Sequence, residues 1–92
     1  PVRPGVVVRE ECVRALGLCR DRLAVAMGVP PKRMSGIVHG KRRIMADTAL
    51  RLSRYFGTSD RFWLNLQTRF DLEKEGINLG AALDRIQPLH IA

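Results

Sequence analysis

The stretch RDRLAVAMGVPPKRMSGIVH, Arg20–His39, decides how the rest of this sequence is interpreted. It places apolar side chains at the spacing of two short packed helices: Leu23, Ala24, Met27, Val29, Met34 and Ile37. The small Ala24 lets the helices approach closely, and Gly28 can adopt the positive φ that ends a helix and reverses the chain. An ordinary helical corner needs some of these positions, but the complete set in this order favours a helix-turn-helix.

The outward face of the second helix carries small or cationic side chains, as a helix that enters a DNA major groove does. By their place in the motif, Pro31, Lys32 and Gly36 face base edges, and Lys32 is the best candidate for the acceptor edge of a guanine. Arg33 and Ser35 are expected to contact bases or the DNA backbone. The predicted base-reading surface is therefore short and positively charged.

Phosphate contacts are expected on either side of this helix. Arg20 stands at the N-terminus of the first helix of the motif, where unpaired backbone N–H groups favour a phosphate. Lys41, Arg42 and Arg43 form a basic loop that we expect to clamp phosphates, the alternative being a solvated loop. His39 either contacts a phosphate or stabilises the negative end of its own helix dipole.

Charge supports a polyanionic partner. The chain has 16 basic and 9 acidic side chains in 92 residues, a net charge of +7, although a merely basic protein would share that balance. Its distribution says more, because residues 32–43 contain five basic side chains and no acidic one. Six of the nine acidic residues lie outside Arg20–Arg61. The positive field is thus concentrated on the predicted second helix and the loop after it.

Glycines, prolines and caps divide the remaining sequence into helices. We expect helices over residues 4–16, 20–27, 31–39, 46–56, 60–75 and 79–86, with an extended tail after Pro88. Gly17 and Gly76 are expected to stop helices, and Ser59 and Asn78 to cap them. Cys19 should be a poor cap because a thiol is a weak hydrogen-bond acceptor. The length allows one core, so residues 1–92 are expected to form a single domain.

Two apolar stripes lie in the C-terminal half. Phe62, Leu66 and Phe70 fall four residues apart with Trp63 beside them, which indicates core packing more than base stacking. A single helix-turn-helix buries little surface on DNA, so we expect a homodimer that reads two half-sites about one helical turn apart. The second stripe is Leu79, Leu83 and Ile86, at the spacing of one face of the last short helix. The dimer seam is expected to use the helix that contains Phe62 and a dimerisation segment at about 77–92.

Other classes of function find little support. Cys12 and Cys19 form no CxxC pair and are expected to be free thiols in core or cap positions, in a cytoplasmic protein. No apolar run is long enough to span a membrane. His39 and His90 lie far apart in sequence, and no Gly-rich phosphate loop is present. We therefore expect no enzyme activity, no cofactor and no metal.

Several short segments carry a family resemblance. FGTS (56–59), FWLNLQ (62–67) and RFDL (69–72) resemble the signature of HigA-type antitoxins, small members of the Xre/Cro-like helix-turn-helix group. Further matches are PG (4–5) with REE (9–11), LGL (16–18), GKR (40–42) and DTALRL (47–52). The resemblance covers roughly residues 4–88, and FWLNLQ is its most specific part because generic Xre domains lack it.

The resemblance implies an all-α fold, a five- to six-helix lambda-repressor-like DNA-binding domain with a short extended C-terminal tail. It also implies an antitoxin of a type II toxin–antitoxin module. Such a protein neutralises a HigB-type mRNA-cleaving toxin and binds double-stranded operator DNA as a homodimer to repress its own operon. Two alternatives stay open: a standalone Xre-family repressor without a toxin partner, and a toxin neutraliser that does not bind DNA.

The sequence departs from the family pattern at its caps. Cys19, Pro30 and Met45 stand where relatives usually have polar capping residues, and His39 replaces the usual Asn before the GK loop. We therefore expect the helix ends to fray more than in relatives. Lys32 and Gly36 should also change the base preference.

Overall fold

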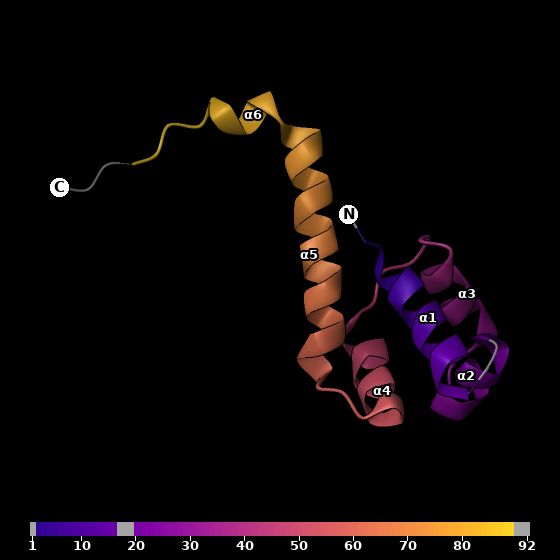
Figure 1. Cartoon of the computed structure of the whole chain (residues 1–92). Helices are drawn as coiled ribbons and strands as arrows, with labels where there is room; N and C mark the ends of the chain where they lie inside the picture. Colours follow the sequence, from indigo (N-terminus) through magenta and orange to yellow (C-terminus); the bar gives the residue numbers. More distant parts are fainter. Residues whose placement is uncertain (1, 17–19, 90–92) are drawn as a thin grey trace.

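The chain is built from helices. The structure, a computed structural model, describes residues 2–16 and 20–89, and for residues 11–16, 20 and 21 it describes the backbone alone. In chain order the helices are α1 (Pro4–Leu16), α2 (Arg20–Met27), α3 (Pro31–Val38), α4 (Ala46–Phe56), α5 (Asp60–Leu79) and α6 (Ala81–Asp84) (Figure 1). Those ranges contain no strand, which confirms the all-α prediction. The expectations for Gly17, the Cys19 cap and the two thiols lie outside the described residues.

The helix-turn-helix forms as predicted from α2 and α3. Every apolar position expected between its helices is buried: Leu23, Ala24, Met27, Val29, Met34 and Ile37. Gly28 has a φ of 70°, and the Val29 N–H donates to the carbonyl of Ala24 at 3.0 Å to close the turn. Pro31 begins α3, where its missing N–H leaves no donor unpaired. The local sequence pattern therefore sufficed to predict this hairpin.

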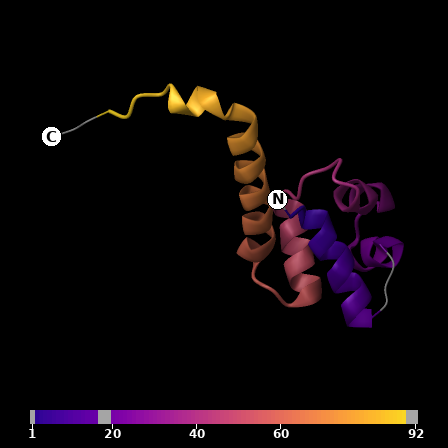
Figure 2. The same cartoon turned by 45° about the horizontal axis from the view of Figure 1, so that its top comes forward.

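Helices α1 and α4 pack on the hairpin, and α5 packs on α1 and α4 (Figures 1 and 2). The start of α1 packs directly on the end of α3, since a Cβ atom at Gly5 would lie 2.0 Å from the carbonyl oxygen of Ile37. Glycine is thus required at position 5. Apart from the hairpin, the buried apolar residues among the described side chains are Val8, Ile44, Ala49, Leu52 and Trp63. The core therefore draws on α1, α4, α5 and the loop between α3 and α4.

The aromatic stripe of α5 is offset by one residue from the prediction. Trp63 is fully buried and its indole N–H donates to the Thr58 hydroxyl at 2.8 Å, whereas Phe62 is 41% exposed. Leu66 and Phe70 are half-buried. The prediction that Phe62 belongs to the core is wrong, because α5 packs through Trp63 and Gln67. Phe62 instead packs its ring edge against Trp63, with centroids 4.9 Å apart.

The end of α5 also differs from the prediction. Gly76 does not stop the helix, and Asn78 does not cap the next one, because α5 continues to Leu79. An internal glycine costs a helix only about 1 kcal/mol, which does not end it. The chain turns instead at Gly80, whose φ of 41° a side chain would disfavour. The short α6 follows, and Ile86 lies beyond it instead of on a common stripe with Leu79 and Leu83.

Helix caps follow the sequence closely. The Ser59 hydroxyl accepts a hydrogen bond from the Phe62 N–H at 3.2 Å, which confirms Ser59 as the N-cap of α5. Gly57 ends α4 with a φ of 74°. Pro30 and Met45 stand at the N-caps of α3 and α4 without a side-chain hydrogen bond, as expected. In residues 2–16 and 20–89, none of the helices combines the length and apolarity that crossing a bilayer requires.

Candidate nucleic-acid interface

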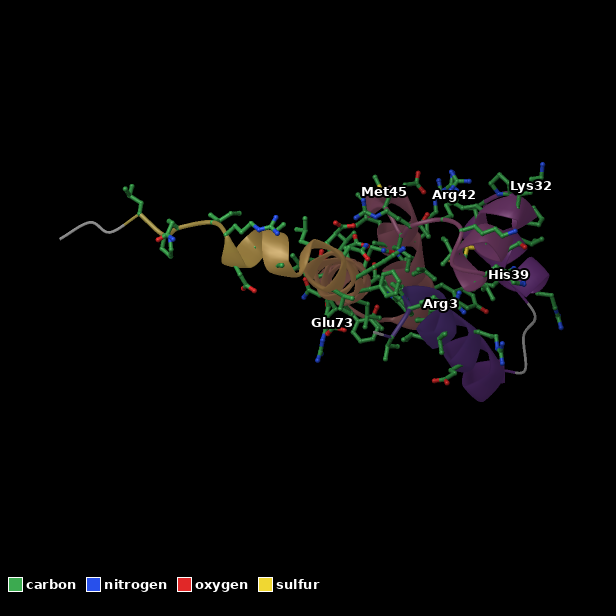
Figure 3. All side chains as sticks on the ribbon, turned by 90° about the horizontal axis from the view of Figure 1, so that it is seen from above. Arg3, Lys32, His39, Arg42, Met45 and Glu73 are labelled. Carbon is green, nitrogen blue, oxygen red and sulfur yellow. The ribbon has the colours of Figure 1, made fainter. Side chains whose placement is uncertain are left out.

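The start of α3 presents Lys32 to solvent. Pro31 and Lys32 are exposed, while Met34 and Ile37 on the opposite face of the helix are buried. Seen from above, Lys32, Arg42 and Met45 lie along one edge of the molecule, and Arg3 and Glu73 lie toward the opposite side (Figure 3). Folding therefore brings the start of α3 and the basic loop to a common edge.

Arg33 is engaged within the protein. Its guanidinium donates to the Asp47 carboxylate at 2.9 Å, and its side chain is 24% exposed. The same carboxylate oxygen accepts from Nε of Arg51 at 2.7 Å, and Nη1 of Arg51 donates to the Met27 carbonyl at the end of α2, also at 2.7 Å. This network ties α3 and the end of α2 to α4. The sequence does not mark the contact between Asp47 and Arg33, because the two residues lie in different helices.

The two arginines lower the pKa of Asp47. The hydrogen bond from Arg51, with the charges of Arg51 and Arg33, holds the pKa of Asp47 below its ordinary value of 3.8. Desolvation opposes this shift without reversing it. The carboxylate therefore stays ionised at neutral pH and keeps both guanidinium groups in place.

Gly36 faces the basic loop. A Cβ atom there would lie 3.1 Å from Cβ of Arg42. The Gly36 carbonyl also accepts hydrogen bonds from the backbone N–H groups of Lys41 and Arg42, at 2.8 and 3.1 Å. The close approach that this glycine permits is thus made to the chain's own loop. The loop in turn lies directly against the end of the proposed recognition helix.

Ser35 and His39 interact at the end of α3. His39 occupies the C-cap, and its Nδ1 atom lies 2.8 Å from the Ser35 carbonyl and 3.4 Å from the Ser35 hydroxyl. With Nδ1 protonated, the ring donates to the Ser35 carbonyl, which also accepts the backbone N–H of His39 at 3.0 Å. The His39 carbonyl accepts from Arg3 at 3.2 Å. These contacts favour the helix-end role of His39.

The three cations of the basic loop have different surroundings. The Arg43 guanidinium pairs with the Asp71 carboxylate of α5. Lys41 and Arg42 are exposed, and the ion pairs found in the described ranges engage neither of them, nor Lys32. Lys32, Lys41 and Arg42 are therefore the cations best placed to meet an external anion.

Two further points concern the predicted residues. Arg20 begins α2, as expected, but its side chain lies outside the described residues. Within the described part of the chain, no group of three or more His, Cys, Asp or Glu side chains is arranged to hold a metal ion. The arrangement offers cationic side chains along a helix and its adjoining loop, which suits electrostatic binding of a polyanion.

Known proteins with similar sequences and structures point to one family. No family model matches the chain. Virulence-associated protein I of Dichelobacter nodosus is 46% identical over 83 residues, covering 85% of this chain and 77% of that protein. The solved structure of an addiction module antidote protein of a HigA family from Coxiella burnetii superposes with a TM-score of 0.93 at 36% identity, covering 97% of this chain and 98% of that one. Pseudomonas aeruginosa antitoxin HigA, solved with the higBA promoter, gives a TM-score of 0.91 at 36% identity, covering 98% and 99%.

Proposed function

Because this chain belongs to the HigA family of helix-turn-helix antitoxins, we propose that it neutralises a HigB-type mRNA-cleaving toxin and represses its own operon as a DNA-bound dimer. The observation that carries the proposal is its likeness to an antitoxin solved with promoter DNA, over nearly the whole of both chains. The edge that contains Lys32 and Arg42 supplies a matching charged surface (Figure 3).

Roles can be assigned to the cations of this edge. Lys32, exposed at the start of α3, reads a guanine acceptor edge in the major groove. Lys41 and Arg42 contact phosphates beside it, and Arg20 contacts a phosphate at the N-terminus of α2. Arg43 serves the loop through Asp71 instead of contacting DNA itself. The base-reading set is thus smaller than the sequence suggested.

The dimer seam is proposed along the C-terminal part of the chain, at about residues 77–92. In the part of this segment that the structure describes, every residue is exposed, including Ile77, Leu79, Leu83 and Ile86. Exposed apolar side chains in such density mark an interaction surface. A second copy of the chain that packs on this segment would supply the second α3 helix that a two-half-site operator requires.

The DNA-binding role is tested with a duplex from the promoter region of the chain's own operon. Fluorescence anisotropy should show tighter binding to this duplex than to a scrambled one. Lys32→Ala should reduce that preference, by about 1–3 kcal/mol. Arg42→Ala should weaken binding to both duplexes. It should also make the negative slope of log K against log salt shallower by about one. Equal affinity of the wild-type protein for both duplexes would contradict an operator-binding role. The remaining alternative would then be a protein that neutralises a toxin without binding operator DNA.

The toxin-binding role is tested by co-expression with the adjacent gene. A stable complex with the adjacent gene product, and relief of that product's mRNA cleavage, are the expected results. A protein that binds its promoter but neutralises no toxin would be a standalone repressor. The proposal places the protein in the cytoplasm, where operator and mRNA are found, and assigns it no catalytic activity of its own.

A further inference from the structure

The basic loop at residues 40–45 is held at two ends. At its start, the Lys41 and Arg42 N–H groups donate to the Gly36 carbonyl of α3. At its end, the Ile44 N–H donates to Oε1 of Gln67 on α5 at 2.8 Å, across 23 positions of sequence. Gln67 is only 4% exposed, so this amide is a built part of the fold and not a chance surface contact.

Gln67 is itself held by Asp71, one turn further along α5. Nε2 of Gln67 donates to Oδ1 of Asp71 at 3.0 Å, and Oδ2 of the same carboxylate accepts from Arg43. One amide and one carboxylate thereby fix two successive residues of the loop, Arg43 and Ile44. The amide uses its acceptor on the loop and a donor on the carboxylate, so each group orients the other.

Packing holds this loop at one residue, Ile44. Ile44 is buried, but its neighbours from Gly40 to Arg43, and Met45 after it, are all exposed. The loop borders a hollow of about 170 Å³ whose lining includes Gly5, Ile37 and Phe70. The contacts to α3 fix the backbone at Lys41 and Arg42, and the polar contacts from α5 fix the two residues that follow, so both sets of contacts hold the exposed cations in place.

We propose that Gln67 and Asp71 are positioning residues for DNA binding, which hold the basic loop where Lys41 and Arg42 meet phosphates. The inference rests on the proposed function. In this proposal Arg43 does not contact a phosphate itself, because its guanidinium pairs with Asp71 and fixes the loop. It also makes two residues of α5, distant from the duplex, determinants of operator affinity.

Asp71→Asn separates positioning from simple charge. The substitution removes one negative charge and releases Arg43, so electrostatics alone predicts tighter binding to DNA. Positioning predicts the opposite. We expect operator affinity to fall by roughly fivefold or more, although the protein becomes more positive. The negative slope of log K against log salt should become shallower by about one, because phosphate contacts are lost.

Glu73→Gln is the matched control. It makes the same change of charge on the same helix, two residues away, at a side chain that pairs with Arg69 at 3.2 Å instead of with the loop. Glu73 also lies away from the edge of Lys32 and Arg42 (Figure 3). This variant should bind the operator as tightly as the wild-type protein, or slightly more tightly.

A double-mutant cycle and a local probe complete the test. Arg43→Gln should weaken binding, and Arg43→Gln combined with Asp71→Asn should be no weaker than Asp71→Asn alone, because both break the same contact. Amide hydrogen exchange at Ile44 should become faster in Asp71→Asn and stay unchanged in Glu73→Gln. All affinities are measured where circular dichroism shows each variant folded, since a merely structural role would lower the melting temperature and leave the affinity unchanged.

Each outcome has one meaning. Asp71→Asn binding as tightly as the wild-type protein, or more tightly, would overturn the positioning role while leaving the proposed function intact. Additive losses in the cycle would return Arg43 to a direct phosphate contact and overturn it as well. A wild-type protein that does not prefer its own promoter would remove the proposed function, and this inference with it.

Discussion

The bundle of α1–α4 with the first part of α5 and the C-terminal arm, residues 72–89, differ in how far their large apolar side chains are buried. In the bundle, large side chains such as Trp63, Leu23 and Leu52 are fully buried. In the arm, every residue is exposed, and Leu72, Ile77 and Ile86 keep 69%, 72% and 67% of their surface. Figures 1 and 2 show why, because the upper part of α5 and α6 extend away from α1–α4. The molecule is accordingly elongated, with extents of 54 × 25 × 22 Å.

The contrast shows what an apolar pattern does and does not determine. Helical spacing of apolar residues predicts a face that must be covered, but not what covers it. In the bundle the cover comes from the chain itself. In the arm the structure shows no cover from the described part of the chain, and the proposed function assigns that place to a second copy. Stability of the bundle and assembly through the arm should therefore respond to different substitutions.

The largest effect is expected in the core. Trp63→Ala should destabilise the protein by about 3–5 kcal/mol, because a large cavity replaces the indole and the Thr58 hydroxyl loses its partner. The free energy of unfolding from urea denaturation measures this. Phe62→Ala, at the neighbouring exposed ring, should cost clearly less. Equal losses at the two positions would mean that the predicted stripe, centred on Phe62, describes the core better than the structure does.

Charges placed in the arm should affect assembly and spare the bundle. Leu83→Asp combined with Ile86→Asp should raise the dimer dissociation constant at least tenfold, about 1.4 kcal/mol, because carboxylates enter an apolar seam. Sedimentation velocity measures the change. Arg85→Asp, which alters the net charge by the same amount between these two positions, is the control. A dimer that survives the double substitution would locate the seam elsewhere.

A smaller effect is expected at the two glycines of the arm. Nothing lies within 4 Å of a Cβ atom at Gly76, which sits inside α5, so Gly76→Ala should stabilise this part of the helix. The gain should be about 0.5–1 kcal/mol, seen as slower amide exchange at residues 74–79. Gly80→Ala should do the reverse, since a φ of 41° disfavours a side chain. Faster exchange in Gly76→Ala would restore Gly76 as a helix stop.

The smallest effect concerns pH and the bundle alone. The pKa of Asp47 is lowered in the folded protein, so its ion pairs contribute stability above the ordinary value of 3.8. That contribution should disappear as the pH falls below this value and through the lowered pKa. Melting temperatures should show Asp47→Asn less stable than the wild-type protein at pH 7. The difference should shrink toward pH 2, and one that stays constant would exclude the ionised carboxylate as its cause.

Much of the fold was accessible from the sequence because it depends on neighbours in the chain. The α2–α3 hairpin, its turn at Gly28 and the cap at Ser59 use residues a few positions apart. The same local logic failed at Gly76, where a glycine has a helical conformation, and at Phe62, where Trp63 on an adjacent face of α5 packs into the core. In both cases two residues of the same kind lie close together, and the structure places the turn at Gly80 instead of Gly76 and the core aromatic at Trp63 instead of Phe62.

The candidate site shows the same division. Sequence located the basic residues of α3 and its loop, since charge and motif position are visible in the chain. Which cations remain available was decided by partners 14 and 28 positions away, Asp47 for Arg33 and Asp71 for Arg43. No local pattern marks those partners, because a carboxylate on a helix surface has many uses.

By itself, the sequence determined the helices apart from the end of α5, the turn between α2 and α3, the place of positive charge and the family. Only the tertiary structure decided that Trp63 lies in the core, that α5 holds the basic loop through Gln67 and Asp71, and that the arm projects uncovered. The physical reason is range. Helix formation and capping depend on hydrogen bonds between residues within about four positions of each other, whereas helix packing and ion pairing depend on where distant segments meet in space.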